Sequence, residues 1–214
     1  MRTTACCWLA ALGIAASALE ASATTITSDF STDLEGWTAT AGSGTPVWTA
    51  SGGNPAGYLF IDNVDGAVIV SVIAPAKFLG NLSSSNGGTL SFDGNLLSAG
   101  NIINQVSYGR VRISTSSGNP ATLDLALNNP AVGVWTSYSA PLDAATWGQT
   151  PARWAQILSN VTEIAITLEA VFGLETNGFD NFAITSVPEP SPAALLAFAT
   201  GGGLTLARRL RRAR

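Results

Sequence analysis

The chain has 214 residues, a net charge of −4, no histidine and only two cysteines, Cys6 and Cys7. The absence of histidine excludes Ser-His-Asp triads, Cys-His pairs and the usual zinc ligand sets, and the chain after Cys7 has no thiol for a disulfide or a nucleophile. Residues 1–23 contribute no net charge and residues 187–214 contribute +4, so the segment between them carries −8. Such an acidic segment repels phosphates, which excludes nucleic acid as a partner.

The N-terminus has the three parts of a secretory signal peptide. Arg2 precedes an apolar stretch from Ala5 to Leu19, and the small residues Ala21-Ser22-Ala23 follow. We therefore predict a signal peptide over residues 1–23, with cleavage after Ala23. The alternative is an N-terminal helix of the folded domain.

Residues 24–186 have the composition of a β-domain, because charged residues are scarce while Gly, Ser, Thr, Asn and Val are frequent. Residues 67–73 are apolar on both faces, which predicts a covered central strand that Pro75 ends because proline has no ladder donor. Residues 122–127 and 162–169 alternate with the two-residue period of a strand. Turns are predicted at four pairs, namely Gly87-Gly88, Asn119-Pro120, Asn129-Pro130 and Asn177-Gly178.

One short helix is predicted after Thr150. Thr150 is a suitable N-cap, Pro151 suits the first helical position, and Trp154, Ile157 and Leu158 follow at helical spacing. Many short strands with one helix indicate an all-β, two-sheet jelly-roll sandwich over residues 24–186.

The C-terminus combines a proline-rich motif, an apolar run and an arginine cluster. The run from Pro192 to Ala207 spans about 24 Å as a helix, shorter than the roughly 30 Å of a bilayer core, although arginines can reach the interface. This tail, residues 187–214, resembles the PEP-CTERM sorting signal. The resemblance implies export in a Gram-negative bacterium, a single membrane helix, and processing by an exosortase that recognises Pro188, Glu189 and Pro190. The alternative is a buried helix of the domain followed by a basic tail.

A second resemblance lies inside the domain. The segment Ala74-Pro75-Ala76-Lys77-Phe78-Leu79-Gly80 is followed by Gly87-Gly88-Thr89-Leu90-Ser91-Phe92, and Phe179-Asp180-Asn181-Phe182 comes near the end. These segments are similar to the laminin B domain, also called laminin domain IV. The resemblance implies a jelly-roll without enzymatic activity, although the cysteine-rich modules that flank it in laminins are missing here. Physically, the first two segments specify the fold, because Phe78 and Leu79 close the edge of the sandwich and Gly80 and Gly87-Gly88 permit tight reversals.

Calcium is the metal that the sequence favours. Asp29 begins the first strand region and Asp180 lies in the last, and Asp62 or Asp65 could join them to bind a structural calcium ion through oxygen ligands. The alternative is that Asp180 caps a turn and Asp29 is solvated.

The predicted ligand surface is one face of a strand that carries Tyr108, Arg110 and Arg112. An aromatic ring beside two guanidinium groups could bind an acidic polysaccharide. Exposed arginines on a strand also commonly serve solubility.

We therefore expect an exported, non-enzymatic cell-surface or matrix module that is structural, adhesive or polysaccharide-binding. The expected partners are an exosortase, the inner membrane, and exopolysaccharide or other surface proteins. A glycosidase is the alternative, because two carboxylates suffice for that chemistry. Glu163 and Glu169 are separated by about 20 Å along a strand, so a catalytic pair would have to form between strands.

Overall fold

The computed structural model describes residues 22–63, 69–100, 107–126 and 128–188. Residues Ala23–Val187 form one compact unit. The predicted signal peptide and sorting tail therefore fall almost wholly outside the described residues. Asp65, one of the predicted calcium ligands, also lies outside them. Within the described ranges, no helix is both long enough and apolar enough to cross a membrane.

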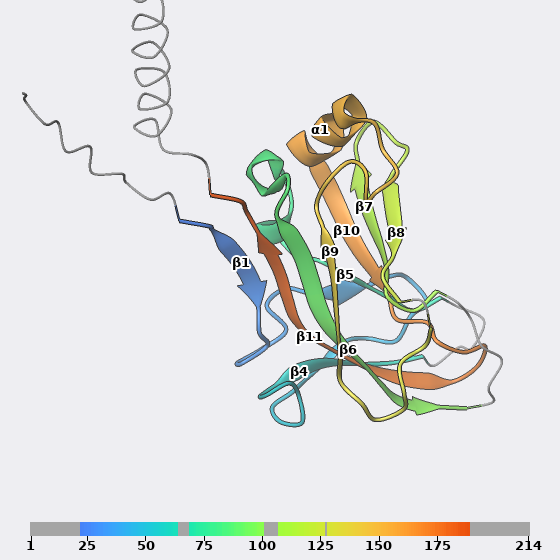
Figure 1. Ribbon diagram of the computed structural model, residues 1–214. Helices are drawn as coiled ribbons and strands as arrows, with labels where there is room; N and C mark the ends of the chain where they lie inside the picture. The colour runs from blue at the N-terminus through green and yellow to red at the C-terminus, as the bar shows by residue number, and fades with distance from the viewer. Residues whose placement is uncertain (1–21, 64–68, 101–106, 127, 189–214) are drawn as a thin grey trace, which may run out of the picture. The chain divides into compact units, whose positions relative to one another are not determined.

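The unit consists of two antiparallel sheets with a helix at one end (Figure 1). Sheet A contains β1 (Thr25–Ser28), β3 (Val47–Thr49), β4 (Tyr58–Asp62), β6 (Thr89–Ala99), β9 (Thr136–Pro141) and β11 (Glu175–Thr185). Sheet B contains β2 (Thr38–Ala39), β5 (Ser71–Ile73), β7 (Arg110–Thr115), β8 (Ala121–Asp124) and β10 (Val161–Thr167). Two 3-10 turns, η1 (Ala76–Phe78) and η2 (Ser83–Ser85), and the helix α1 (Pro151–Ser159) complete the unit.

The strand pairing is that of a jelly roll. Strand β4 pairs with β11, β5 with β10, β6 with β9, and β7 with β8. The chain from β4 to β11 therefore pairs like one long hairpin that is rolled into two sheets. This topology confirms the predicted two-sheet sandwich, and β1 beside β11 brings the two ends of the domain together.

Aromatic side chains fill the space between the sheets. The ring of Trp37 lies 4.9 Å from that of Phe179 and 5.0 Å from that of Phe182, and Phe78 lies 4.7 Å from Phe182. The indole N–H of Trp37 donates to Ser28 Oγ at 2.8 Å, so the buried polar atom is satisfied. Each such ring pair adds about 0.5–1.5 kcal/mol beyond the area it buries.

The segments that resemble the laminin B domain contribute to the packing of the sandwich. Phe78, carried by η1, is fully buried, as the sequence predicted for a residue that closes the sandwich edge. A Cβ on Gly88 would lie 1.8 Å from the carbonyl oxygen of Thr185. Glycine is required at this position because the backbone of β11 passes too close for any side chain.

The predicted helix is confirmed. Thr150 Oγ1 accepts a hydrogen bond from the backbone N–H of Arg153, Pro151 occupies the first turn, and Trp154, Ile157 and Leu158 are buried. This arrangement is the one that an N-cap followed by proline favours.

One predicted turn is wrong. Asn177-Gly178 lies in the middle of β11, where Asn177 pairs with Ile61 and Gly178 with Phe60. A Cβ on Gly178 would lie 2.8 Å from the ring of Trp135. The glycine therefore serves the close approach of an aromatic ring to the sheet rather than a reversal of the chain.

Two predicted strands are shorter than expected. The predicted strand over 67–73 is described only as β5, and the strand over 122–127 ends at Asp124. Strand β5 lies between β2 and β10, as expected for a covered strand, and Val72 is fully buried.

Candidate functional site

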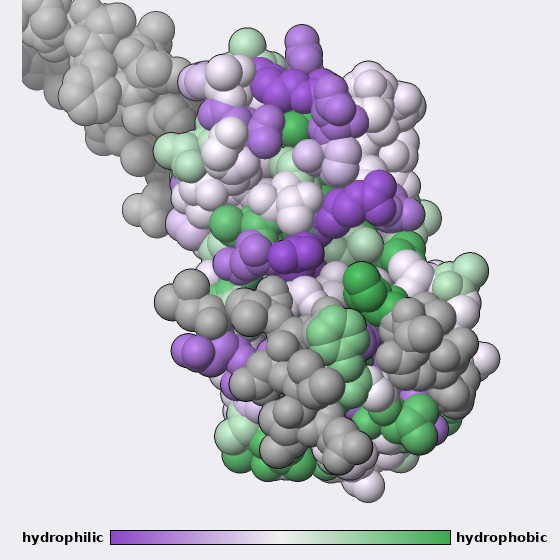
Figure 2. Space-filling view, turned by 90° about the vertical axis from the view of Figure 1, so that its right-hand side faces the viewer, coloured by the Kyte–Doolittle hydropathy of each residue, from purple (hydrophilic) through white to green (hydrophobic). Residues whose placement is uncertain are grey.

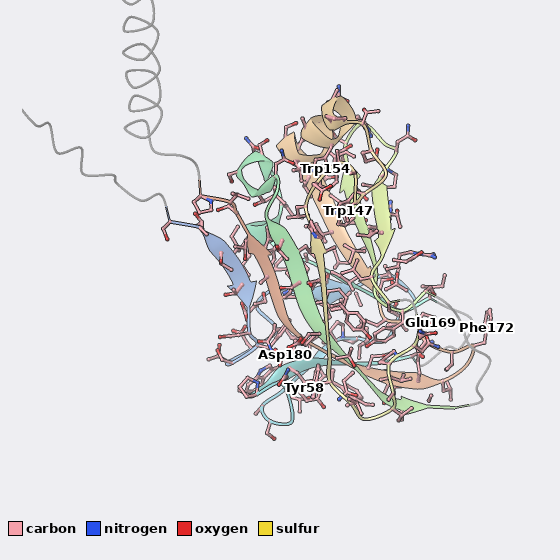
Figure 3. The ribbon with its side chains drawn as sticks, viewed as in Figure 1. Tyr58, Trp147, Trp154, Glu169, Phe172 and Asp180 are labelled. Carbon is pink, nitrogen blue, oxygen red and sulfur yellow. The ribbon has the colours of Figure 1, made fainter. Side chains whose placement is uncertain are left out.

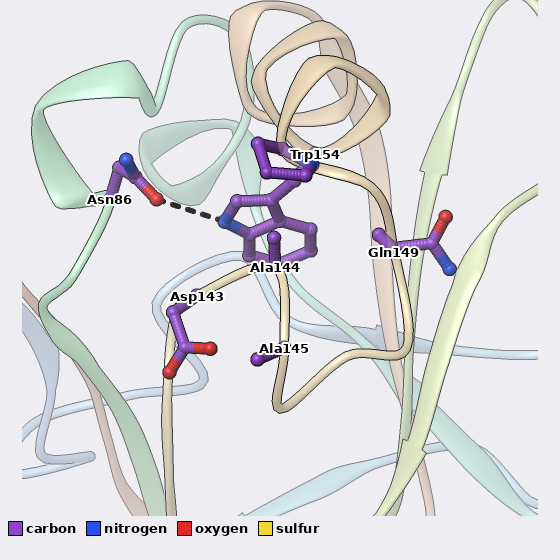
Figure 4. Close-up of a pocket in the computed structure, with 7 residues that line it drawn as sticks. Asn86, Asp143, Ala144, Ala145, Gln149 and Trp154 are labelled. Carbon is purple, nitrogen blue, oxygen red and sulfur yellow. Dashed lines mark hydrogen bonds between the residues drawn. The ribbon is translucent and has the colours of Figure 1, made fainter.

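A surface pocket of about 400 Å³ lies beside the start of α1. It is lined by Asn86, Asp143, Gln149 and Trp154 together with Ala144, Ala145 and Pro151. Figure 4 shows the indole of Trp154 between the side chains of Asn86 and Gln149. Its volume falls at the small end of the range found for small-molecule sites.

The wall of the pocket is built by the connection between β9 and α1. Asp143 Oδ1 accepts from the backbone N–H of Thr146 and Asp143 Oδ2 from its hydroxyl, each at 2.9 Å, which fixes a tight turn. The backbone N–H of Gly87 donates to the carbonyl of Leu142 at 2.8 Å and holds the Asn86 loop against this turn. The pocket is therefore set by short local motifs and by hydrogen bonds between distant segments.

Trp154, which lines the pocket, is held by ring packing and two hydrogen bonds. The rings of Trp147 and Trp154 are stacked with their centroids 5.4 Å apart. The indole N–H of Trp154 donates to Asn86 Oδ1 at 3.0 Å and to the carbonyl of Leu142 at 3.2 Å. These contacts hold Trp154 and Asn86 in one arrangement before any ligand binds.

The pocket offers both donors and acceptors. Because Asn86 Oδ1 accepts from Trp154, the Asn86 amide nitrogen remains as a donor, and Gln149, whose Nε2 donates to the carbonyl of Trp147, keeps Oε1 as an acceptor. Hydrogen bonds from the backbone and hydroxyl of Thr146 lower the pKa of Asp143, so this carboxylate is charged and accepts only.

The predicted ligand surface is not formed as expected, because Tyr108 does not share a face with the two arginines. Tyr108 is 1% exposed and lies in the core, whereas Arg112 is exposed and Arg110 is partly exposed. Arg110 pairs with Asp124 at 2.5 Å and Arg112 with Glu163 at 3.1 Å. Tyr108 precedes β7 in a turn, so the two-residue period of the strand does not extend back to it.

The face of the molecule that carries β7 and β8 is correspondingly hydrophilic over most of its upper part (Figure 2). Hydrophobic surface gathers toward the opposite end of this view. The described chain exposes Phe172 and Leu174 by more than half, at 53% and 60%. The ion-paired arginines therefore lie on ordinary polar surface.

The three aspartates predicted to bind calcium do not converge. Asp62 is exposed at the end of β4, opposite Thr176, four residues before Asp180 along β11. Asp29 is exposed at the end of β1, where hydrogen bonds from Ser31 lower its pKa, and its charge contributes to the raised pKa of Asp180. No cluster of three or more Asp, Glu, His or Cys that could hold a metal is present among the residues that the structure describes.

Asp180 instead lies directly opposite Asp93 of β6. Asp180 accepts from the backbone N–H groups of Asn54 and Asn181, both at 2.7 Å, and Asp93 accepts from the Asn181 amide at 2.7 Å. Burial, opposed by these hydrogen bonds and reinforced by the charge of Asp93, raises the pKa of Asp180 to about 6. Figure 3 shows Asp180 near Tyr58, well away from Trp147 and Trp154 below α1.

Little in the sequence indicated the pocket. Trp154 was predicted only as a position of the helix after Thr150, and both Trp147 and Trp154 are 2% exposed. Asn86, Asp143 and Gln149 belong to ordinary loop sequence, next to the predicted turn at Gly87-Gly88 and the predicted helix cap at Thr150. Their convergence depends on the contact between Gly87 and Leu142, for which the sequence carries no pattern.

No protein-family model and no curated protein matches the chain. Among solved structures, an exo-β-agarase has a TM-score of 0.53 at 15% identity, covering 76% of this chain and 24% of that chain. The L4b domain of human laminin alpha-2 has a TM-score of 0.48 at 11% identity, covering 60% of this chain and 80% of that domain. The C-terminal family 22 carbohydrate-binding module of Clostridium thermocellum Xyn10B has a TM-score of 0.47 at 11% identity, covering 78% and 95%.

The likeness to the exo-β-agarase concerns the fold. The chain contains a jelly-roll β-sandwich that is similar to about a quarter of the exo-β-agarase chain. At such low identities the likeness concerns the fold alone, so function must be argued from the pocket.

Proposed function

We propose that the domain is a non-catalytic polysaccharide-binding module of an exported protein, and that the pocket beside α1 binds a neutral sugar unit. The observation that carries the proposal is the hydrogen bond from Trp154 that fixes Asn86, which leaves a free amide donor on Asn86 beside a free acceptor on Gln149. Sugar hydroxyl groups both donate and accept, so they match such a mixed set. The volume of about 400 Å³ accommodates one sugar ring and leaves the adjoining units of a chain in solvent.

The pocket is suited to binding rather than to glycoside hydrolysis. Hydrolysis requires two carboxyl groups about 5–9.5 Å apart, one of which is protonated. Asp143 is the one carboxyl that lines the pocket, and its lowered pKa keeps it ionised. The pocket therefore has no group to serve as the general acid.

The test is binding of the full chain to exopolysaccharide from the producing organism and to a glycan array. We expect Asn86→Ala and Gln149→Ala each to weaken binding by about 2- to 10-fold, the value of one neutral hydrogen bond. Arg112→Ala is the matched control, because it removes a polar side chain from the face of sheet B and should leave binding unchanged. Unchanged binding in both pocket variants, or no bound glycan at all, would refute the proposal.

Glycoside hydrolysis at Asp93 and Asp180 is the second candidate function. Side chains directly opposite each other on paired strands have Cβ atoms about 4.5–5.5 Å apart, and the raised pKa of Asp180 beside Asp93 resembles an acid–base pair. Asp93 is 7% exposed and Asp180 is 1% exposed, and this burial argues against substrate access. Release of reducing sugar that Asp180→Asn abolishes would establish the enzyme.

Export and sorting belong to the same proposal. We propose that residues 1–23 are removed on secretion and that an exosortase processes the tail near Pro188, Glu189 and Pro190. A surface location suits a polysaccharide-binding module, and a protein–protein adhesion module is the alternative role. Mass spectrometry of the mature protein tests this part, since an intact Met1 and Arg214 would refute both cleavages.

A further inference from the structure

A second pair of carboxyl groups lies between the two sheets. Glu169 follows β10 in sheet B and Glu175 begins β11 in sheet A, so the short connection between them brings the two side chains together. Each is 1% exposed. Figure 3 shows Glu169 at the end of the sandwich away from α1, beside Phe172.

The polar groups that contact this pair are neutral. Glu169 Oε2 accepts from the backbone N–H of Val70 at 3.1 Å and from the Asn63 amide at 3.4 Å. Glu175 Oε2 accepts from the backbone N–H groups of Ala170 and Val171, both at 3.0 Å. Neither carboxylate has an ion-pair partner within the described ranges. When both are ionised, two buried negative charges lie close together with no compensating cation among the residues that the structure describes.

The pKa values of both carboxyl groups are raised. Burial raises the pKa of Glu175 to about 7, with a further contribution from the charge of Glu169, and burial also raises the pKa of Glu169.

Asn177 is an independent sign of a ligand at this place. It is fully buried on the inner face of β11, two residues beyond Glu175, and lies close enough to lower the pKa of that carboxyl. Its Oδ1, the amide atom that can bind a cation, has no hydrogen-bond partner. Buried amide groups without a partner are rare in folded proteins and call for a bound water or ion.

We propose that Glu169, Glu175 and Asn177 bind one calcium ion between the sheets. Two carboxylates and an amide oxygen are the ligand types that calcium prefers, and calcium accepts irregular coordination, with water and backbone carbonyls in the remaining positions. A divalent ion balances both charges and binds Asn177 Oδ1, whereas one shared proton balances a single charge and leaves that oxygen unpaired. The ion would join sheet A to sheet B at the end opposite α1.

The experiment measures the melting temperature of the chelator-treated full chain, with and without calcium at neutral pH. A calcium concentration one hundred times the Kd should raise Tm by about 5–10 °C. Glu175→Gln should abolish this shift, since it removes a charged ligand and keeps the shape. Asn177→Asp should instead tighten calcium binding in calorimetry by adding a charge, which gives a gain of function that misfolding cannot imitate.

Asp180→Asn is the matched control, because Asp93 and Asp180 form the other buried carboxylate pair. Calcium stabilisation that survives in Asp180→Asn and disappears in Glu175→Gln supports the proposal. Stabilisation that disappears in Asp180→Asn but survives in Glu175→Gln would overturn it by placing the ion on sheet A's outer face. No calcium shift in the wild-type chain would overturn it as well.

Discussion

Replacement of Tyr108 by phenylalanine should stabilise the protein. The Tyr108 hydroxyl is buried and has no hydrogen-bond partner, and burial, followed by the charges of Tyr138 and Glu175, raises its pKa well above the usual value. A buried polar group without a partner costs about 1–3 kcal/mol, and this cost disappears when the oxygen is removed. Part of the gain is offset by the small void that remains, so we expect a net gain of about 1 kcal/mol.

The packing around this hydroxyl supplies a second, coupled measurement. A Cβ on Gly94 would lie 2.7 Å from the Tyr108 hydroxyl oxygen but 3.2 Å from the nearest ring carbon. Gly94→Ala should therefore destabilise the wild type strongly and cost less in the Tyr108→Phe background. A double-mutant cycle measures this coupling directly.

The assay is urea denaturation followed by tryptophan fluorescence. Tyr108→Phe should raise the midpoint without changing the m-value and should raise Tm by about 2–4 °C. A loss of stability in Tyr108→Phe would refute the reasoning, because it would mean that the hydroxyl makes a favourable hydrogen bond. Additive effects of Tyr108→Phe and Gly94→Ala would show that a Cβ at position 94 does not contact the Tyr108 hydroxyl group.

Three further predictions concern charge, capping and close packing. The folded-state pKa of Asp180 is raised to about 6 from 3.8, so its contribution to stability is present at pH 4 and is lost as the pH rises through 6. The wild-type chain should therefore lose more stability than Asp180→Asn between pH 4 and 8 in urea titrations. Parallel curves of stability against pH for the two proteins would contradict this. Thr150→Ala should lower stability by about 1 kcal/mol through loss of the hydrogen bond from Arg153, with Thr150→Ser as the control that retains it. Gly178→Ala should displace Trp135 from the sheet, which a change in tryptophan emission would report; unchanged emission and stability would rule out the close contact.

The sequence by itself determined the class of fold and its local elements. The helix at Thr150 was predictable because the cap, the proline and the buried positions all lie within one short segment. The two-residue alternation over 162–169 anticipated β10 for the same reason. The absence of histidine and of cysteine beyond Cys7 excluded whole classes of catalysis without any structure.

Tertiary structure decided which residues meet. Asp180 meets Asp93 rather than Asp62 because the register between β6 and β11 places them opposite each other, and a register is a property of two segments. Tyr108 appeared to belong to an exposed face, but its ring enters the core at a turn where strand periodicity does not apply.

The two sites of interest depend on such distant contacts. The pocket requires the Asn86 loop to lie against Trp154, and the proposed calcium site requires the end of sheet B to meet the start of sheet A at Glu169 and Glu175. Short-range patterns report backbone preference and burial, which the local sequence determines. Pairing across the sheets arises from how the long hairpin rolls, and only the folded structure supplies that geometry.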